Sequence, residues 1–275
     1  MKWFWGTLVL LVGLLGCRGI KMESSWREQK IRVDGRDGEW AEKYVFDKEG
    51  AIIGLANDAE HLYVFLSTRN RTLQMKLLRQ GFSVSFDPKG GKKSGFGVRY
   101  PLGLGQDDLW LLMESMRGGG AGWNGGPMQG VGGQINEQML QSIYDTVIAE
   151  GQMEILGGGG VGQFFSIALV PEIEVALSFE DGRLVYELKV PLARVETKEY
   201  KIGIDVPESR VVGIGFQTPE LDPRALRRQG DPRIGGAGMG GMGRGDGYRR
   251  RRGVGIFREV MQPFQLWAKV ELAVR

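Results

Sequence analysis

The stretch IEVALSFEDGRLVYELKV, residues 173–190, carries the clearest structural signal in the chain. Apolar and polar residues alternate over 173–179 and again over 184–190, a period of two that is typical of β-strands. Glu180-Asp181-Gly182 separates the two runs, and Asp-Gly favours a tight hairpin turn because both residues tolerate positive φ angles. The stretch therefore predicts two antiparallel strands.

Similar patterns on both sides of this hairpin predict the rest of the fold. Apolar residues at helical spacing predict two helices, and these do not alternate regularly with the strands, which argues against a βαβ arrangement. The sequence therefore predicts a mainly β protein, an antiparallel β-sandwich with two short peripheral helices and glycine-rich loop insertions. The further elements are strands at 31–33, 51–55, 61–67, 153–156, 211–216 and 264–272, a hairpin at 82–100, and helices at 70–80 and 135–150.

Glycine divides the chain. It supplies 45 of the 275 residues, gathered mainly in patches. Residues 102–134 are predicted to be a glycine-rich insertion, and residues 221–253 a flexible insertion rich in glycine and arginine, because such compositions cannot repay the entropy lost on ordering. Both fall inside a single predicted β-sandwich domain, residues 29–275. The formal net charge of +3 is too small to indicate a partner.

The N-terminus indicates export. Lys2 precedes an apolar run, residues 3–16, that is too short to cross a hydrocarbon core of about 30 Å at about 1.5 Å per residue, but has the length of a secretory signal. The run ends in Leu14-Leu15-Gly16-Cys17, which resembles the lipobox of bacterial lipoproteins. That resemblance implies a signal peptide at 1–16, removed on cleavage, and a lipid on Cys17.

Cys17 is the only cysteine in the chain, and acylation would give this lone thiol a use. Residues 17–28 are then a tether. The alternatives are an ordinary cleaved signal with an incidental cysteine, or a short membrane anchor. By the sorting rule of the lipoprotein family, Arg18 in place of Asp after the cysteine favours the outer membrane over the inner membrane as the place of a lipid-anchored envelope protein.

Two motifs resemble a known group of sandwiches. Ile31-Arg32-Val33-Asp34-Gly35 followed by Trp40, and Ala56-Asn57-Asp58 followed by Leu62-Tyr63-Val64, are similar to the family 9 carbohydrate-binding modules and the wider DOMON-like group. The resemblance spans residue 31 to about 216 and the last strand near Trp267. It implies a β-sandwich and a binding role, since sugar-binding members hold a glycan between exposed aromatic residues. Trp40 and Tyr63 are interpreted as core residues, and His61 as structural or surface rather than a haem ligand.

Two tryptophans are candidates for ligand contact. Trp123 lies in Gly122-Trp123-Asn124-Gly125, where nothing local would bury it, and an exposed indole suits stacking on a sugar ring. Trp110 follows Asp107 and Asp108, which could accept hydrogen bonds from hydroxyls. The alternatives are an indole that folds back over the sandwich and acids that are merely solvated.

Two charged clusters are candidate ion sites. Asp34, Asp37 and Glu39 crowd one turn and could ligate Ca²⁺ together with backbone carbonyls, although acids in a loop are usually only solvated. The run Arg249-Arg250-Arg251-Arg252 lies in the second insertion, where nine arginines face three aspartates. Guanidinium groups suit phosphates, acidic glycans or anionic lipid. The alternative is a solvated insertion without a partner.

Signatures of common enzymes are absent from the sequence. No Gly-Lys-Ser or Gly-Lys-Thr appears, one histidine and one cysteine do not make a zinc site, and no serine lies in Gly-x-Ser-x-Gly. The leading hypothesis is a non-catalytic binding domain, for carbohydrate or another envelope ligand. The alternatives are a structural or assembly lipoprotein that binds protein partners and, third, a glycoside-active enzyme. Nucleic acid is not an expected partner outside the cytoplasm.

Overall fold

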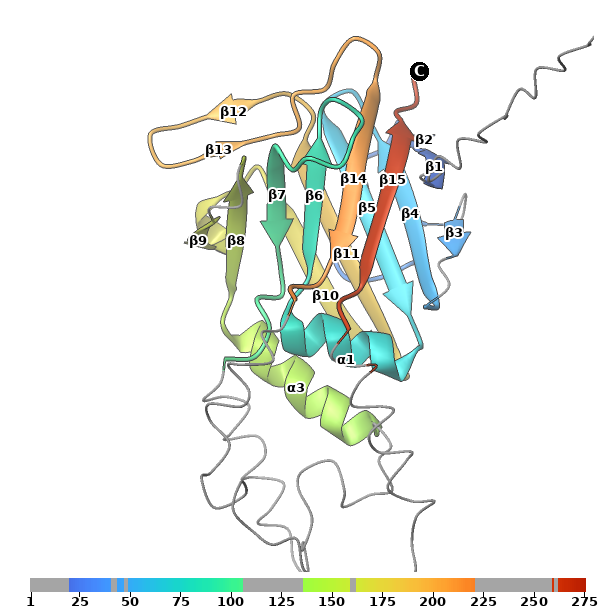
Figure 1. Cartoon of the computed structure of the whole chain (residues 1–275), viewed down its shortest axis with the longest axis vertical. Helices are drawn as coiled ribbons and strands as arrows, with labels where there is room; N and C mark the ends of the chain where they lie inside the picture. The colour runs from blue at the N-terminus through green and yellow to red at the C-terminus, as the bar shows by residue number, and fades with distance from the viewer. Residues whose placement is uncertain are drawn as a thin grey trace, which may run out of the picture.

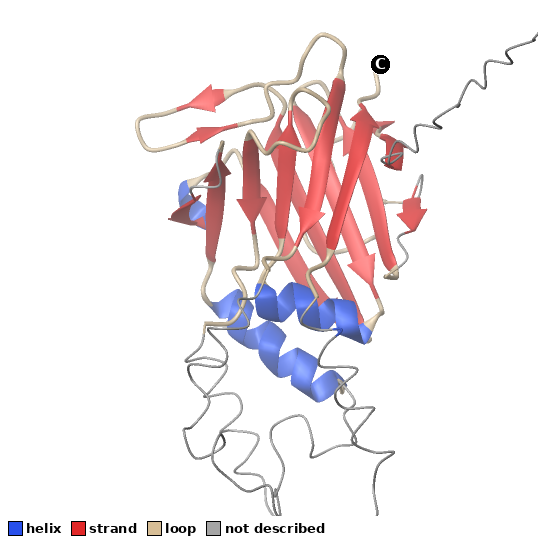
Figure 2. Ribbon diagram, in the orientation of Figure 1, coloured by secondary structure: helices blue, strands red, loops and turns tan. Residues whose placement is uncertain are grey.

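A computed structural model describes residues 20–40, 44–46, 49–105, 136–158, 162–220, 259 and 262–275. Two β-sheets pack face to face, and two helices lie side by side at one end of them (Figure 1, Figure 2). The predicted β-sandwich with two peripheral helices is therefore confirmed.

The seven-stranded sheet has the order β1-β15-β14-β6-β7-β8-β9. All neighbours in it are antiparallel except β1 and β15, which are parallel. Its strands are β1 (Ile20–Glu23), β15 (Gln265–Glu271), β14 (Val211–Gln217), β6 (Ser83–Asp87), β7 (Phe96–Arg99), β8 (Gln152–Gly157) and β9 (Gly162–Ser166).

The six-stranded sheet has the order β10-β11-β5-β4-β2, with β3 also paired to β4. Here the only parallel pair among the described strands is β2 with β4. The strands are β10 (Glu174–Glu180), β11 (Arg183–Pro191), β5 (His61–Thr68), β4 (Ala51–Asn57), β2 (Ser25–Trp26) and β3 (Tyr44–Phe46). A small hairpin of β12 (Val195–Glu196) and β13 (Lys201–Ile202) projects from the end opposite the helices (Figure 1).

The hairpin predicted at residues 173–190 forms β10 and β11. Glu180 pairs with Arg183, so only Asp181 and Gly182 make the turn. Their φ angles are 50° and 68°, and two positive angles define the type I′ turn that fits the right-handed twist of paired strands.

The two helices are α1 (Arg71–Gln80) and α3 (Glu137–Ala149), close to their predicted ranges. Asn70 caps α1, because its side-chain oxygen accepts hydrogen bonds from the backbone N–H groups of Thr72 and Leu73 at 2.9 and 3.2 Å. Within the described ranges, neither helix is long and apolar enough to cross a membrane.

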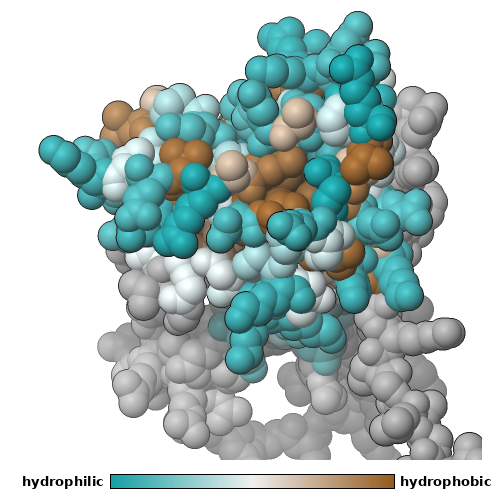
Figure 3. Space-filling view, turned by 90° about the horizontal axis from the view of Figure 1, so that it is seen from above, coloured by the Kyte–Doolittle hydropathy of each residue, from teal (hydrophilic) through white to brown (hydrophobic). Residues whose placement is uncertain are grey.

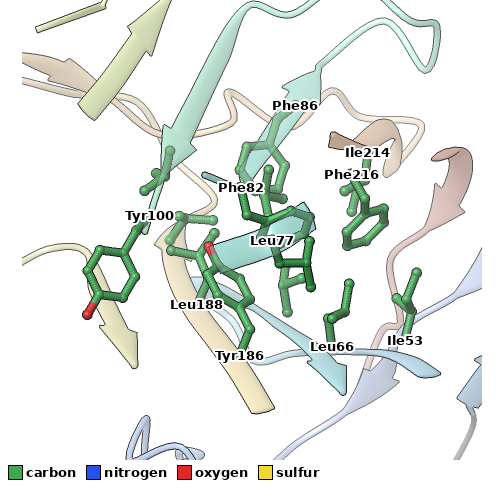
Figure 4. Packing of buried hydrophobic residues seen from close by; sticks show 14 of the residues in the cluster. Ile53, Leu66, Leu77, Phe82, Phe86, Tyr100, Tyr186, Leu188, Ile214 and Phe216 are labelled. Atoms are coloured by element: carbon green, nitrogen blue, oxygen red, sulfur yellow. The ribbon is translucent and has the colours of Figure 1, made fainter. Parts of the chain in front are cut away.

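The hydrophobic core lies between the sheets and is closed by α1 at one end (Figure 4). Ile53, Leu66 and Leu188 from the six-stranded sheet face Phe86 and Phe216 from the other sheet, and each is fully or almost fully buried. Burying one such side chain contributes about 1.5–3 kcal/mol. With no disulfide among the described residues, this apolar layer is the main source of cohesion.

The prediction of a strand at 31–33 is wrong. Ile31 is buried, but the segment lies against the outer face of the six-stranded sheet without pairing as a strand. The backbone N–H groups of Asp34 and Gly35 donate to the carboxylate of Glu187 and not to a neighbouring strand.

Several short strands were not predicted. β1 and β2 fall within the segment 17–28 that was interpreted as a tether, and they pair with β15 and β4, which are remote in sequence. β2, β12 and β13 have two residues each, too few for any period to show.

Candidate functional site

The outer face of the six-stranded sheet is closed. Trp40 is only 2% exposed and stacks on Phe65 of β5, with ring centroids 5.0 Å apart. Ile31, Ala56, Tyr63 and Val185 belong to the same apolar cluster. The interpretation of Trp40 and Tyr63 as core residues is confirmed, and this face presents no aromatic platform at Trp40.

Glu187 of β11 fastens the covering segment to this face. Its Oε1 accepts a hydrogen bond from Trp40 Nε1 at 2.6 Å, and its Oε2 accepts from the N–H groups of Asp34 and Gly35 at 2.9 and 2.6 Å. Burial raises the pKa of this carboxyl and the three hydrogen bonds lower it, with a net pKa above the ordinary value. Both oxygens of this buried carboxylate are hydrogen-bonded within the protein, so Glu187 is not available to bind a ligand.

The acids proposed for calcium point to separate partners. Asp37 pairs with Arg183 at 2.6 Å, Glu39 accepts a hydrogen bond from the N–H of Arg32 at 2.8 Å, and Asp34 lies 3.6 Å from the same arginine's Nε. In the part of the chain that the structure describes, no three His, Cys, Asp or Glu side chains gather so that they could hold a metal ion. Calcium binding at this turn stays a prediction.

His61 begins β5 at the edge of a polar corner. Its Nδ1 lies 3.5 Å from the carboxylate of Asp58. That carboxylate accepts hydrogen bonds from the N–H groups of Glu60 and His61 and from the Tyr63 hydroxyl. Burial raises the pKa of Asp58, but these hydrogen bonds outweigh it, so the pKa lies below its ordinary value. The acid shapes the β4–β5 turn, which agrees with a structural role for His61.

The outer face of the seven-stranded sheet is open to solvent at β15. Its strand alternates buried Leu266, Ala268 and Val270 with Trp267 and Lys269 on the other side. This face is turned to the viewer in Figure 1, where β15, β14, β6 and β7 lie in front of the six-stranded sheet.

Trp267 lies across the neighbouring strand. It pairs in register with Gly215 of β14, and a Cβ on that glycine would be 2.6 Å from both Cε2 and Cζ2 of the indole. Because glycine has no side chain there, the ring can settle onto the strand. The ring stays partly exposed, and its outward face is an apolar platform with a polar N–H at its rim.

Neutral hydrogen-bonding side chains lie beside this platform. Gln217 pairs in register with Gln265 and with Ser83, so the three share the outer face with Trp267. Gln217 also reaches over Gly215, since a Cβ on the glycine would be 2.8 Å from its Nε2. Each amide offers both donors and an acceptor, which suits hydroxyl groups. Ser83 itself is buried, so the side chains open to a ligand are the indole and the two amides. We call Trp267, Gln217 and Gln265 the tryptophan platform.

Charge enters only at the far end of the same row. Ser83 pairs with Arg99, whose Nη1 lies 3.1 Å from Glu154 and whose Nη2 donates to the carbonyls of Gln80 and Leu102. The guanidinium is therefore occupied by the protein. The glutamine row beside Trp267 is therefore neutral and polar, and Lys269 lies two residues further along β15 on the same face.

The other predicted site residues lie outside the described residues. They are Cys17, Asp107, Asp108, Trp110, Trp123 and Arg249 to Arg252. The chain leaves the described part after Gly105, beyond β7, and after Glu220, beyond β14. Arg99 and Gln217 belong to the same row of the sheet, so the described chain ends at both predicted insertions on the side that carries the tryptophan platform.

Sequence reasoning missed Trp267 as a site residue, although the signal was present. The alternation over 264–272 places Leu266, Ala268, Val270 and Leu272 on the buried face and leaves an indole on the polar one. A large aromatic side chain on the polar side of an alternating strand is the signal that could have identified Trp267 as a site residue.

Comparisons with known proteins give distant structural likeness only. No family model matches the chain, and no curated protein matches it. Among solved structures, the chain is similar to a family 9 carbohydrate-binding module from Caldicellulosiruptor kristjanssonii in complex with glucose, and to the same module with cellotriose. Identity is 10% and the TM-score 0.33 in both, over 74% of this chain and 81% and 79% of the module.

Proposed function

We propose that this protein is an exported, lipid-anchored envelope protein whose sandwich binds carbohydrate without catalysing a reaction. The observation that carries the carbohydrate proposal is Trp267, a partly exposed indole laid on Gly215 beside the neutral amides of Gln217 and Gln265. Apolar ring faces stack on the C–H face of a sugar, and amides satisfy its hydroxyls. The resemblance of the two sequence motifs to sugar-binding sandwiches points the same way.

A glycan array tests the proposal. The mature chain, residues 17–275, carries Cys17→Ser to remove the lipid and is screened beside Trp267→Ala and a matched control, Trp26→Ala, which removes another partly exposed indole. Affinity for the glycan should fall by about tenfold or more in Trp267→Ala. The stacking of a nucleobase on an aromatic side chain contributes a comparable amount to binding. The control should bind like the parent chain.

The array also distinguishes the described platform from the insertion. Loss of binding in Trp110→Ala or Trp123→Ala, with Trp267→Ala unaffected, would move the site to residues 102–134. No binding to any glycan by a folded protein, with calcium supplied, would contradict the carbohydrate proposal.

The anchor rests on the lipobox resemblance and on the single cysteine. Cys17 is the predicted acylation site, and the outer membrane is the predicted location. Labelling cells with a tagged fatty acid should mark the parent chain and leave Cys17→Ser unmarked. A fatty-acid label that survives Cys17→Ser would contradict the anchor.

One observation favours the second hypothesis, an assembly lipoprotein with protein partners. Phe164 on β9 is 63% exposed and Leu169 in the short helix η1 (Ile167–Leu169) is 67% exposed. β9 is the end strand of the described seven-stranded sheet, where an edge can accept another strand. Phe164→Lys should abolish partner capture on that hypothesis and leave glycan binding unchanged.

A further inference from the structure

The outer face of the seven-stranded sheet carries a second feature, at the end away from the helices. Five lysines from three separate segments lie there, and all five are exposed. Seen from that end, the described surface is largely hydrophilic, with apolar side chains visible in its middle (Figure 3). We call these residues the lysine face: Lys21 of β1, Lys269 of β15, and Lys89, Lys92 and Lys93 of the β6–β7 turn.

The β6–β7 turn is built to lie on the sheet. Asp87 is only 4% exposed, and its two carboxylate oxygens accept hydrogen bonds from the N–H groups of Lys89 and Lys93 at 2.9 and 2.8 Å. Gly213 of β14 has no side chain, and the carbonyl of Gly91 occupies the place where one would stand. The turn therefore folds down over β14, with its lysine side chains free to project.

The turn meets the lysines of the neighbouring strands. A Cβ on Gly90 would lie 3.7 Å from Cε of Lys269, so that side chain reaches the turn. Lys269 is in register with Lys21 on β1, which places these two side by side on the same face. Lysine ammonium groups from three segments therefore lie on one surface.

The charge of this surface is not neutralised by the described part of the protein. None of the five lysines is within 4.0 Å of a carboxylate among the described residues. Two acids, Glu23 and Glu271, lie two positions further along the same strands. Within these three segments, five lysines against two exposed glutamates leave an excess of positive charge, because Asp87 is buried and engaged by the turn.

We propose that the lysine face docks the domain on the anionic phospholipid headgroups of the membrane that holds it. The choice of membrane rests on the lipid anchor proposed above. β1 begins at Ile20, three residues after Cys17, and three extended residues span at most about 11 Å. A lipid on Cys17 would hold β1, and the lysines beside it, at the bilayer surface, where anionic headgroups attract basic side chains.

Vesicle binding tests the docking without any lipid on the protein. The chain 17–275 with Cys17→Ser is sedimented with phosphatidylcholine vesicles, with and without phosphatidylglycerol. It should bind only the anionic vesicles and lose binding as salt is raised, since headgroup attraction is screened. The triple variant K89Q/K92Q/K93Q should bind about tenfold more weakly or worse, because each lysine contributes to the attraction.

A control triple keeps the charge change constant. K30Q/R32Q/R36Q removes three exposed basic residues of the segment that covers the outer face of the six-stranded sheet, and it should bind like the parent chain. Equal loss in both triples, no binding to anionic vesicles, or binding to an acidic polysaccharide in preference to them would each overturn the docking proposal. Neither an acyl chain nor a neutral glycan takes part, so failure here is distinguishable from failure of the anchor or of the tryptophan platform.

Discussion

Trp40 and Trp267 lie on opposite outer faces of the same sandwich, and their surroundings differ in every respect. Trp40 is 2% exposed, stacks on Phe65 and donates its N–H to the buried carboxylate of Glu187. Trp267 lies on a glycine, stays partly exposed and has neutral amides beside it. The difference shows what decides the role of each indole. Trp40 is covered by its own chain segment and stabilises the fold, whereas Trp267 lies on a glycine and keeps one side exposed to solvent.

The largest expected effect is on the closed face. Trp40→Ala removes a buried indole. It also removes the stacking contact with Phe65 and the hydrogen bond to Glu187. The free energy of unfolding should fall by about 3–5 kcal/mol, the usual cost of such a cavity. Urea unfolding measures it. A loss below about 1 kcal/mol would mean that the segment 27–40 is not fastened to the sheet as described.

A smaller effect is expected at the carboxylate that fastens the segment. Glu187→Gln places an amide N–H against N–H donors from Trp40 or from Asp34 and Gly35, and should cost about 1–3 kcal/mol. The pKa of Glu187 is raised in the folded state, so stability depends on pH. The contribution of this side chain to the free energy of unfolding is fully present below the ordinary pKa of 4.5, and it is lost as pH rises through the folded pKa.

Unfolding measured at several pH values checks the sign of this effect. The difference in free energy of unfolding between the parent chain and Glu187→Gln should be largest at acid pH and shrink as pH rises. A difference that grows with pH would show that the three hydrogen bonds outweigh burial, and that the carboxyl has a lowered pKa instead.

The smallest effect on stability is expected on the open face. Trp267→Ala removes a partly exposed ring that lies on Gly215, and should change the free energy of unfolding by no more than about 1 kcal/mol, as surface substitutions usually do. The same variant should lose glycan binding. A destabilisation as large as that of Trp40→Ala would make Trp267 another structural tryptophan and remove the contrast between the faces.

The sequence predicted those turns and strands that depend on interactions between residues close together in the chain. The Asp181-Gly182 hairpin and the strands at 61–67 and 211–216 follow from contacts between near neighbours. The failures depend on remote partners. The segment 31–33 has strand-like alternation, but its N–H groups meet Glu187, about 150 residues away.

The site was less predictable because it depends on which side chains meet. Trp267 and Gly215 are each ordinary in sequence, and only the register of β14 with β15 lays one on the other. The lysine face likewise combines β1, β15 and a turn, whose adjacency follows from Gly213 and from a parallel pairing of the first and last strands. Sequence periodicity places a residue on a face but does not name its neighbour across the sheet.

The most direct test of the tryptophan platform follows the indole N–H signals by NMR while a pool of cello-, malto- and chito-oligosaccharides is added. Five of the seven tryptophans lie in the mature chain, residues 17–275, and single substitutions assign their signals. The tryptophan platform predicts that the Trp267 signal shifts on addition of glycan, while the Trp40 signal, held by Glu187, does not move. A spectrum in which Trp267 stays unchanged while another indole shifts, or in which no indole responds, would contradict it.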